Sequence, residues 1–388
     1  MRKIGVVTTS RADYGIYNPV LKLIKADPDL RLHLYVSGMH LSPEFGFTVK
    51  EIEADGYEIE DRIETLLSSD SPEGISKSMG LALIGFSQAF AHSDIDMLVV
   101  LGDRFEMHAA ALAALPFKIP VAHIHGGEIT RGAIDDALRH SITKLSHVHF
   151  VATKTFANRI IQLGEEPWRV TVTGAPSLDN LQLLDLLDRE ELLEKFGLEI
   201  KPDPFLLVTF HPVTLEYENT EWQTKELLAA LENIGLPCIF TMPNADTHGR
   251  VIRRLISEFV DSHPKSQAIE NLGTQGYFSL MRLASAMIGN SSSGMVEAAS
   301  FELPVVNIGT RQMGREGGKN VINVEYSRQA VQIGIKKAIK PEFKASLAGM
   351  ENPYGNGYAA VKIVQQLKSM EIGQKLIMKV FYDLEVLS

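Results

Sequence analysis

The chain has 388 residues, a formal net charge of -10 at pH 7 and a hydrophobic content of 45%. These values are typical of a globular protein with room for two domains, and the acidic balance argues against a nucleic-acid partner. No stretch approaches the roughly 18 uninterrupted apolar residues needed to span a bilayer, and the single cysteine, Cys238, fits a reducing compartment. We therefore expect a cytoplasmic protein with no membrane partner.

The first half alternates short apolar runs with helical patterns, which predicts a parallel sheet covered by helices. Strands are expected at residues 4–8, 32–37, 97–101, 119–124, 148–152 and 170–173, and helices at residues 75–92 and 133–144. Residues 42–78 are rich in Glu, Asp, Ser and Gly and are expected to form loops. These six strands predict a Rossmann-like domain over residues 1–176.

The second half repeats this alternation after a leucine- and acid-rich connection, residues 177–204, which ends in Lys-Pro-Asp-Pro. Strands are expected at residues 205–210, 237–242, 268–272, 286–289 and 304–308, and helices at residues 220–234, 249–261 and 358–370. A second α/β domain is thus predicted over residues 205–370, with residues 371–388 packing back on one of the domains. Two similar halves predict a cleft between them as the place of the active site.

Polar side chains follow the expected strands of the first half, where the carboxyl ends of parallel strands meet at one edge of the sheet. They are Asp103, Arg104, His125 and Glu128, followed by Asp135 and Arg139 on the next helix. Seven of the twelve histidines lie between His92 and His149. This region is therefore the predicted place of proton chemistry. Near the N-terminus, Arg11 begins a helix, where free N–H groups favour an anion.

In the second half, the sequence Gly-Asn-Ser-Ser-Ser-Gly at residues 289–294 follows a strand and precedes a small-residue helix. Ser291 and Ser292 would hold a phosphate, and Glu297 would accept hydrogen bonds from a ribose; the alternative is an ordinary helix cap. Arg311 adds a cation beside this turn. His211 and Asn244 follow other strands, although a histidine there is as often a structural cap.

The sequence contains no GxGxxG, so a dinucleotide fingerprint is absent and no cofactor is expected. His123 and His125 alternate on an expected strand and could form a metal site with Glu128 or Asp103. No further pair with ligand spacing accompanies them. We therefore expect no metal.

Taken in order, these motifs resemble the UDP-N-acetylglucosamine 2-epimerases, and in particular the hydrolysing branch that feeds sialic acid synthesis. The matching pieces are TSRADYG, GDRFE, HIHGGE with IDDALRH, HPVT, GNSSSG with Glu297, and GTRQMGR, spread over nearly the whole chain. The resemblance implies two Rossmann-like domains of the glycosyltransferase-B type, a UDP-sugar substrate held mainly by the second domain, and a homodimer or homotetramer.

The resemblance also implies roles for single residues. The catalytic candidates are Asp103, His125, Glu128, Asp135 and His211. The candidate substrate-binding residues are Arg11, Arg104, Arg139, Asn244, Ser291, Ser292, Glu297 and Arg311. Family members often carry a glutamate at the position of His125. Glu128 or His125 itself takes the place of that glutamate, and the base that removes the C2 proton is one of the group Asp103, His125, Glu128 and Asp135.

The expected reaction converts UDP-N-acetylglucosamine and water to UDP and N-acetylmannosamine through a 2-acetamidoglucal. The nearest alternative is hydrolysing 2-epimerisation of UDP-2,4-diacetamido-2,4,6-trideoxyglucose, which feeds legionaminic acid. More distant alternatives are a non-hydrolysing epimerase, a glycosyltransferase that uses a UDP-sugar, and a sugar-nucleotide sensor without turnover.

Overall fold

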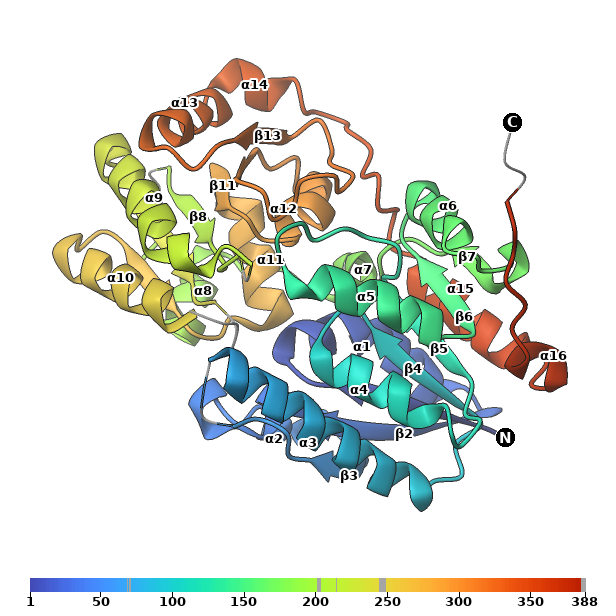
Figure 1. The fold of residues 1–388 in the computed structure, drawn as a ribbon. Coiled ribbons are helices and arrows are strands. Elements are labelled where there is room, and N and C mark those ends of the chain that lie inside the picture. The colour runs from blue at the N-terminus through green and yellow to red at the C-terminus, as the bar shows by residue number, and fades with distance from the viewer. Residues whose placement is uncertain (68, 70, 201–203, 214, 244–248, 385–388) are drawn as a thin grey trace. The chain divides into compact units, whose positions relative to one another are not determined.

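The computed structural model of the chain describes all residues except 68, 70, 201–203, 214, 244–248 and 385–388. The chain divides into two compact units (Figure 1). Unit 1 contains residues 1–128, 134–183 and 354–388, and unit 2 contains residues 129–133 and 184–353. Unit 1 is therefore discontinuous in sequence, because most of unit 2 is inserted before its last segment.

Unit 1 is built on one parallel sheet. Its strands are β1 (Arg2–Thr8), β2 (Leu30–Ser37), β3 (Ile59–Ile63), β4 (Met97–Leu101), β5 (Val121–Ile124), β6 (Val148–Val151) and β7 (Val170–Val172). They lie in the order β3-β2-β1-β4-β5-β6-β7. The central strand β4 is buried along its whole length, as expected for a parallel strand covered on both faces.

Helices cover both faces of this sheet (Figure 1). They are α1 (Arg11–Ala26), α2 (Val49–Ala54), α3 (Pro72–Ala91), α4 (Phe105–Ala114), α5 (Ile134–Leu145), α6 (Lys154–Gln162), α7 (Asn180–Leu183), α15 (Ala359–Ser369) and α16 (Gln374–Ile377). Helix α1 packs against α15, while α3, α4 and α5 pack in a row. The helices predicted at residues 75–92 and 133–144 correspond to α3 and α5.

The prediction of loops over residues 42–78 was wrong. This stretch contains α2, the start of α3 and the edge strand β3, which pairs with β2 and brings the sheet to seven strands instead of six. Strand β3 was missed because its middle residues, Glu60, Asp61 and Arg62, are exposed and charged. Charged residues are common on edge strands, where they hide the apolar pattern of the sheet.

Unit 2 is built on a second parallel sheet, with the order β10-β9-β8-β11-β12-β13. Its strands are β8 (Leu206–Thr209), β9 (Cys238–Thr241), β10 (Gln267–Ile269), β11 (Ala286–Gly289), β12 (Val305–Ile308) and β13 (Val321–Val324). Its helices are α8 (Arg189–Phe196), α9 (Thr220–Ile234), α10 (Gly249–Ser262), α11 (Gly273–Leu283), α12 (Ser293–Val296), α13 (Arg328–Ala338) and α14 (Pro341–Ala345). Five of these strands were predicted, and β13 was missed.

The expected domain boundaries differ from the two units at helix α15. This helix falls inside the predicted second domain, residues 205–370, but it belongs to unit 1. The reason is its apolar face, since Ile363, Val364 and Leu367 are buried in the core that also contains the strands of unit 1. The C-terminal residues also pack on unit 1, where the buried Arg169 donates to the carbonyl of Leu376 at 2.9 Å.

A short loop, residues 129–133, belongs to unit 2, although it lies between two segments of unit 1 in the sequence. The carbonyl of Gly132 accepts a hydrogen bond from the Leu215 amide at 2.7 Å. A Cβ atom on Gly132, whose φ is 74°, would lie 2.7 Å from the Val213 side chain. These contacts hold the loop tightly. In the sequence it lies between Glu128 and Asp135, two residues predicted to act in catalysis.

Candidate functional site

In unit 1, two polar turns emerge side by side because β4 and β5 are paired in register, with Leu101 opposite Ile124. The first turn carries Asp103, whose carboxylate forms an ion pair with Arg139 of helix α5. The Arg139 side chain is 3% exposed, and no described residue accepts a hydrogen bond from its Nε or Nη1. A buried guanidinium with unused donors is suited to bind an anionic or hydroxyl-rich ligand.

The second turn carries a histidine–carboxylate pair. His125 Nδ1 lies 2.5 Å from Glu128 Oε1, and both side chains are almost completely buried. His125 has a φ of 63°, a backbone conformation that is uncommon for a residue with a side chain. A carboxylate bound to one imidazole nitrogen fixes the tautomer and leaves the other nitrogen to exchange a proton.

The backbone of this second turn is held by close packing. A Cβ atom on Gly127, whose φ is 77°, would lie 2.5 Å from the carbonyl oxygen of Phe156. The Arg159 guanidinium donates a hydrogen bond to the Gly127 carbonyl. Arg159 was not predicted from the sequence, because a lone arginine on an amphipathic helix gives no signal.

The two histidines that suggested a metal site have different hydrogen-bond partners. His123 is fully buried, with Nε2 2.8 Å from the Gly102 carbonyl oxygen and Nδ1 3.2 Å from Thr143 Oγ1. Burial lowers the pKa of His123 to about 3, so it is neutral and structural. Within the described part of the chain, no group of three or more His, Cys, Asp or Glu side chains could hold a metal ion.

Two further carboxylates at this edge were missed. Asp13 accepts hydrogen bonds from the backbone amides of Thr9 at 2.8 Å and Ser10 at 2.6 Å, which fixes the turn that carries Arg11. Glu106 is completely buried, 3.3 Å from Arg104 Nε. Burial raises the pKa of Glu106 above its ordinary value, and the opposing effect of Arg104 is smaller. Both carboxylates therefore orient arginines predicted to bind the substrate.

Helix α5 supplies the remaining predicted residue of unit 1. Asp135 lies in its first turn, half-buried, where the helix N-terminus stabilises a negative charge. Its neighbour Asp136 is 3.7 Å from His140 Nε2. Asp103 thus lies in the turn before α4, and Asp135 and Arg139 lie in the first half of α5, which follows the carboxyl end of β5.

In unit 2, Asn290 is hydrogen-bonded to two predicted residues, His211 and Arg311, and directly precedes the predicted serine turn. Asn290 was not itself predicted. Its side chain accepts from the His211 amide at 2.7 Å and donates to the His211 carbonyl at 2.8 Å. Its own carbonyl accepts from Arg311 Nη1 at 3.2 Å and from Gln312 at 2.9 Å. Asn290 therefore fixes His211 and Arg311 beside the serine turn that follows it.

The serine turn begins α12, which is only one turn long. Ser291 and Glu297 are buried, and Ser292 is half-buried. Behind them lies Tyr277, whose hydroxyl is 3.4 Å from Thr209 Oγ1. Burial raises the pKa of Tyr277 to about 12, so the phenol stays protonated. Asn244, the remaining predicted residue, lies outside the described residues.

These turns and their order can be compared with known proteins. A family model described as UDP-N-acetylglucosamine 2-epimerase matches residues 22–368. The chain belongs to this family. The resemblance seen in the motifs is thereby confirmed, and the relatives described next are named as hydrolysing enzymes. The roles assigned to single residues stay predictions.

Two curated relatives and one solved structure illustrate the likeness. The chain is 43% identical to "GDP/UDP-N,N'-diacetylbacillosamine 2-epimerase (hydrolyzing)" of Campylobacter jejuni, over 84% of this chain and 85% of that protein. It is 38% identical to "UDP-N,N'-diacetylbacillosamine 2-epimerase (hydrolyzing)" of Legionella pneumophila, over 98% of this chain and 99% of that protein. The structure of the Neisseria meningitidis UDP-GlcNAc 2-epimerase bound to UDP-GlcNAc superposes with a TM-score of 0.81 at 20% identity, covering 94% and 99% of the two chains.

That structural likeness confirms the predicted fold of two parallel-sheet α/β domains of the glycosyltransferase-B type. None of the helices that the structure describes has the length and apolar composition to cross a membrane.

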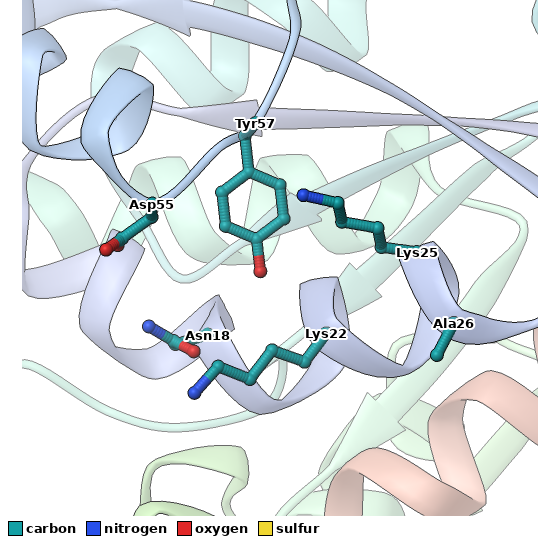
Figure 2. A pocket seen from close by; sticks show the side chains of 6 residues that line it. All are labelled: Asn18, Lys22, Lys25, Ala26, Asp55 and Tyr57. Atoms are coloured by element: carbon teal, nitrogen blue, oxygen red, sulfur yellow. The ribbon is translucent and has the colours of Figure 1, made fainter.

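A surface hollow of about 320 Å³ lies away from these turns, between α1 and the residues that follow α2. Figure 2 shows Lys22, Lys25 and Tyr57 around it. Lys25 donates to the Gly56 carbonyl at 2.6 Å and lies 4.8 Å from the centre of the Tyr57 ring. These contacts pack one surface segment on another, and the hollow is lined by none of the predicted site residues that the structure describes.

Proposed function

We propose that this chain is a hydrolysing 2-epimerase of a UDP-2-acetamido sugar, with UDP-2,4-diacetamido-2,4,6-trideoxyglucose as its first candidate substrate. The observation that carries the proposal is the buried pair of His125 and Glu128, beside the ion pair of Asp103 and Arg139. The first pair supplies an oriented proton acceptor, and the second supplies a cation with unused donors. An elimination that removes a proton while an anionic group departs needs both.

The C2 proton of such a sugar is not acidic, so its removal has to be coupled to the departure of UDP from C1. In the proposed reaction, His125 takes the C2 proton as the C1–O bond to UDP breaks, and a C1=C2 double bond forms. Glu128 holds the imidazole and stabilises the imidazolium that results. Water then adds its hydroxyl to C1, and C2 is reprotonated on the opposite face with Asp103 or Asp135 in the acid/base set.

The leaving diphosphate carries the developing negative charge, which cations and N–H donors stabilise. Arg11, Arg104 and Arg311 are assigned to this charge, with Ser291 and Ser292 on a phosphate and Glu297 on the ribose. His211 is assigned to the diphosphate as a proton or hydrogen-bond donor. The scheme moves no hydride and routes no step through a metal, so no cofactor is proposed.

The choice of substrate rests on the relatives. N,N'-Diacetylbacillosamine is a 2,4-diacetamido-2,4,6-trideoxyglucose, and two relatives with 43% and 38% identity carry its name. UDP-N-acetylglucosamine, which would give N-acetylmannosamine for sialic acid synthesis, is the second candidate. It is favoured by the description of the matching family and by the motifs shared with the sialic acid branch.

The test is proton NMR of the purified protein in D₂O with each of the two UDP-sugars. Release of UDP together with a free 2-epimer that carries deuterium at C2 is the expected result, faster with the diacetamido substrate. Deuterium in a UDP-linked epimer would instead indicate the non-hydrolysing reaction. Binding of UDP without turnover of either sugar would contradict the proposal.

We also propose that the chain forms a homodimer or homotetramer. Helix α4 buries most of its residues in the core, but Leu112 and the following Leu115 are more than one third exposed. Helix α3, which packs against it, exposes Leu81 and Ile84 by 42% and 58%. A row of exposed large apolar residues on adjacent helices is typical of an interface. Light scattering on Ile84→Glu and the unchanged chain tests this assignment.

A further inference from the structure

Unit 2 contains a cavity of about 760 Å³ at the ends of β12 and β13. Its lining comes from Met295 of α12, from the loop after β12, from β13 and the residues that follow it, and from Trp222 of α9. Among the residues that the structure describes, none of those predicted to bind the UDP-sugar lines this cavity. Its chemistry can therefore be considered separately from the proposed reaction.

One of the buried polar groups that line this cavity is the amide of Asn307, which is 2% exposed. Its Nδ2 donates to Asn323 Oδ1 at 2.8 Å. No described residue donates to its Oδ1. If both amides are turned by 180°, the unused atom becomes an N–H donor instead. In either orientation, one atom of a buried amide has no hydrogen-bond partner among the described residues, which is unfavourable in the absence of a ligand or water.

The rest of the lining is largely apolar and aromatic. Met295 is buried below the cavity, while Trp222 and Met313 are 52% and 49% exposed at its rim. The rings of Trp222 and Tyr326 have their centres 6.1 Å apart. The Tyr326 hydroxyl is within hydrogen-bond distance of Thr310 and Glu216, so its ring is the part available to a ligand. Exposed apolar side chains around a buried polar group are typical of small-molecule sites.

The charges of the lining exclude a polyphosphate as the preferred ligand. Arg315 and Glu325 are its only charged residues among those described, and their formal charges cancel. The serine turn, in contrast, has the cation Arg311 beside it and is predicted to bind a phosphate. The two places in unit 2 are therefore suited to different ligands.

We propose that this cavity is a second ligand site, which takes a neutral ring-shaped molecule that carries a secondary amide. Such a group offers an N–H donor next to a C=O acceptor, so it complements Asn307 in either orientation of the side-chain amide. The ring lies against Trp222, and the apolar part contacts Met295 and Met313. Acetamido sugars and uracil nucleosides both present this chemistry.

The site is connected to the serine turn through one loop. Gln312 lines the cavity and also donates to the Asn290 carbonyl at 2.9 Å, the same oxygen that accepts from Arg311. A ligand that contacts Gln312 therefore acts on the loop that carries Arg311. We expect its binding to change the affinity for UDP without competition between the two ligands.

The test uses Trp222 as its reporter. The chain has two tryptophans, so Trp168→Phe leaves Trp222 alone. Its fluorescence is titrated with two matched pairs, N-acetylglucosamine against glucose and uridine against ribose, with and without saturating UDP. We expect a saturable change with at least one amide compound, at least about tenfold tighter than with its partner that lacks the amide. Saturating UDP should shift the midpoint without abolishing the change.

Two variants assign the signal to the cavity. Asn307→Leu removes the buried amide and should weaken binding about tenfold. Gly317→Leu places a side chain next to Met295 and Val321, where a Cβ atom would lie 3.4 Å or more from its neighbours, and should block binding without disturbing the fold. Both should still bind UDP. Equal binding of glucose or ribose, loss of the signal on addition of UDP, unchanged binding in Gly317→Leu, or no saturable change at all would each overturn the proposal.

Discussion

The pair of His125 and Glu128 gives the most direct test of the proposed chemistry, through the change Glu128→Gln. The glutamine has nearly the same size, so the buried turn keeps its packing. The amide can donate to Nδ1, however, which would place the imidazole in the wrong tautomer, and it cannot stabilise an imidazolium. A hydrogen bond to a charged group contributes about 1.5–3 kcal/mol, so kcat should fall by about 10- to 100-fold or more.

The measurement is the rate of deuterium incorporation at C2 and of UDP release, followed by NMR, together with thermal unfolding of each variant. The chain offers a matched control in His33 and Glu60, whose Nδ1 and Oε2 atoms are 2.9 Å apart on neighbouring strands away from the predicted site. Glu60→Gln should leave turnover unchanged. If Glu128→Gln is folded and its kcat lies within threefold of the unchanged chain, His125 and Glu128 are not the pair that removes the proton.

Three other predictions concern Asp103, Asn290 and Glu165. Asp103→Asn should lower kcat at least about 100-fold with a folded protein, and near-normal turnover would exclude it from the acid/base set. Asn290→Ala should raise the Kd for UDP about tenfold by calorimetry, because His211 and Arg311 both lose their anchor; an unchanged Kd would contradict that role. Burial alone would raise the pKa of Glu165, but hydrogen bonds from His149, Lys144 and Lys379 lower it to about 2. Its contribution of up to about 3 kcal/mol is therefore complete above the unfolded pKa of about 4.3 and is lost as the pH falls towards 2. Urea unfolding at pH 7 and pH 3 should show a smaller difference for Glu165→Gln, and an equal difference would refute the assignment.

The parts of the fold that the sequence predicts are those with a strong local pattern. Buried parallel strands such as β4 are nearly continuous apolar runs, and long amphipathic helices such as α9 repeat with the helical period. The predicted α9 has the same bounds as the observed helix. Two of the four edge strands, β7 and β10, were predicted, whereas β3 with its exposed charged residues and β13 with its exposed Asn323 were missed.

The candidate site likewise contains residues that the sequence could locate and residues that it could not. Charged residues directly after strands, such as Asp103, could be located because the direction of parallel strands fixes the edge at which they emerge. The positive φ of His125 could not be predicted from the sequence, and the two histidines of the segment could not be separated by their alternation alone. Asn290 was missed as an anchor because the hydrogen bonds of its side chain and of its carbonyl involve residues far away in the sequence.

The place of helix α15 also has a consequence for synthesis of the chain. Its residues Ile363 and Leu367 complete the core of unit 1, although they follow the whole of residues 184–353 in the sequence. A nascent chain emerges from the ribosome N-terminal end first. Nearly all of unit 2 is therefore available to fold while the earlier sheet still has an uncovered apolar face, and the N-terminal half has to stay soluble until the last thirty or so residues appear.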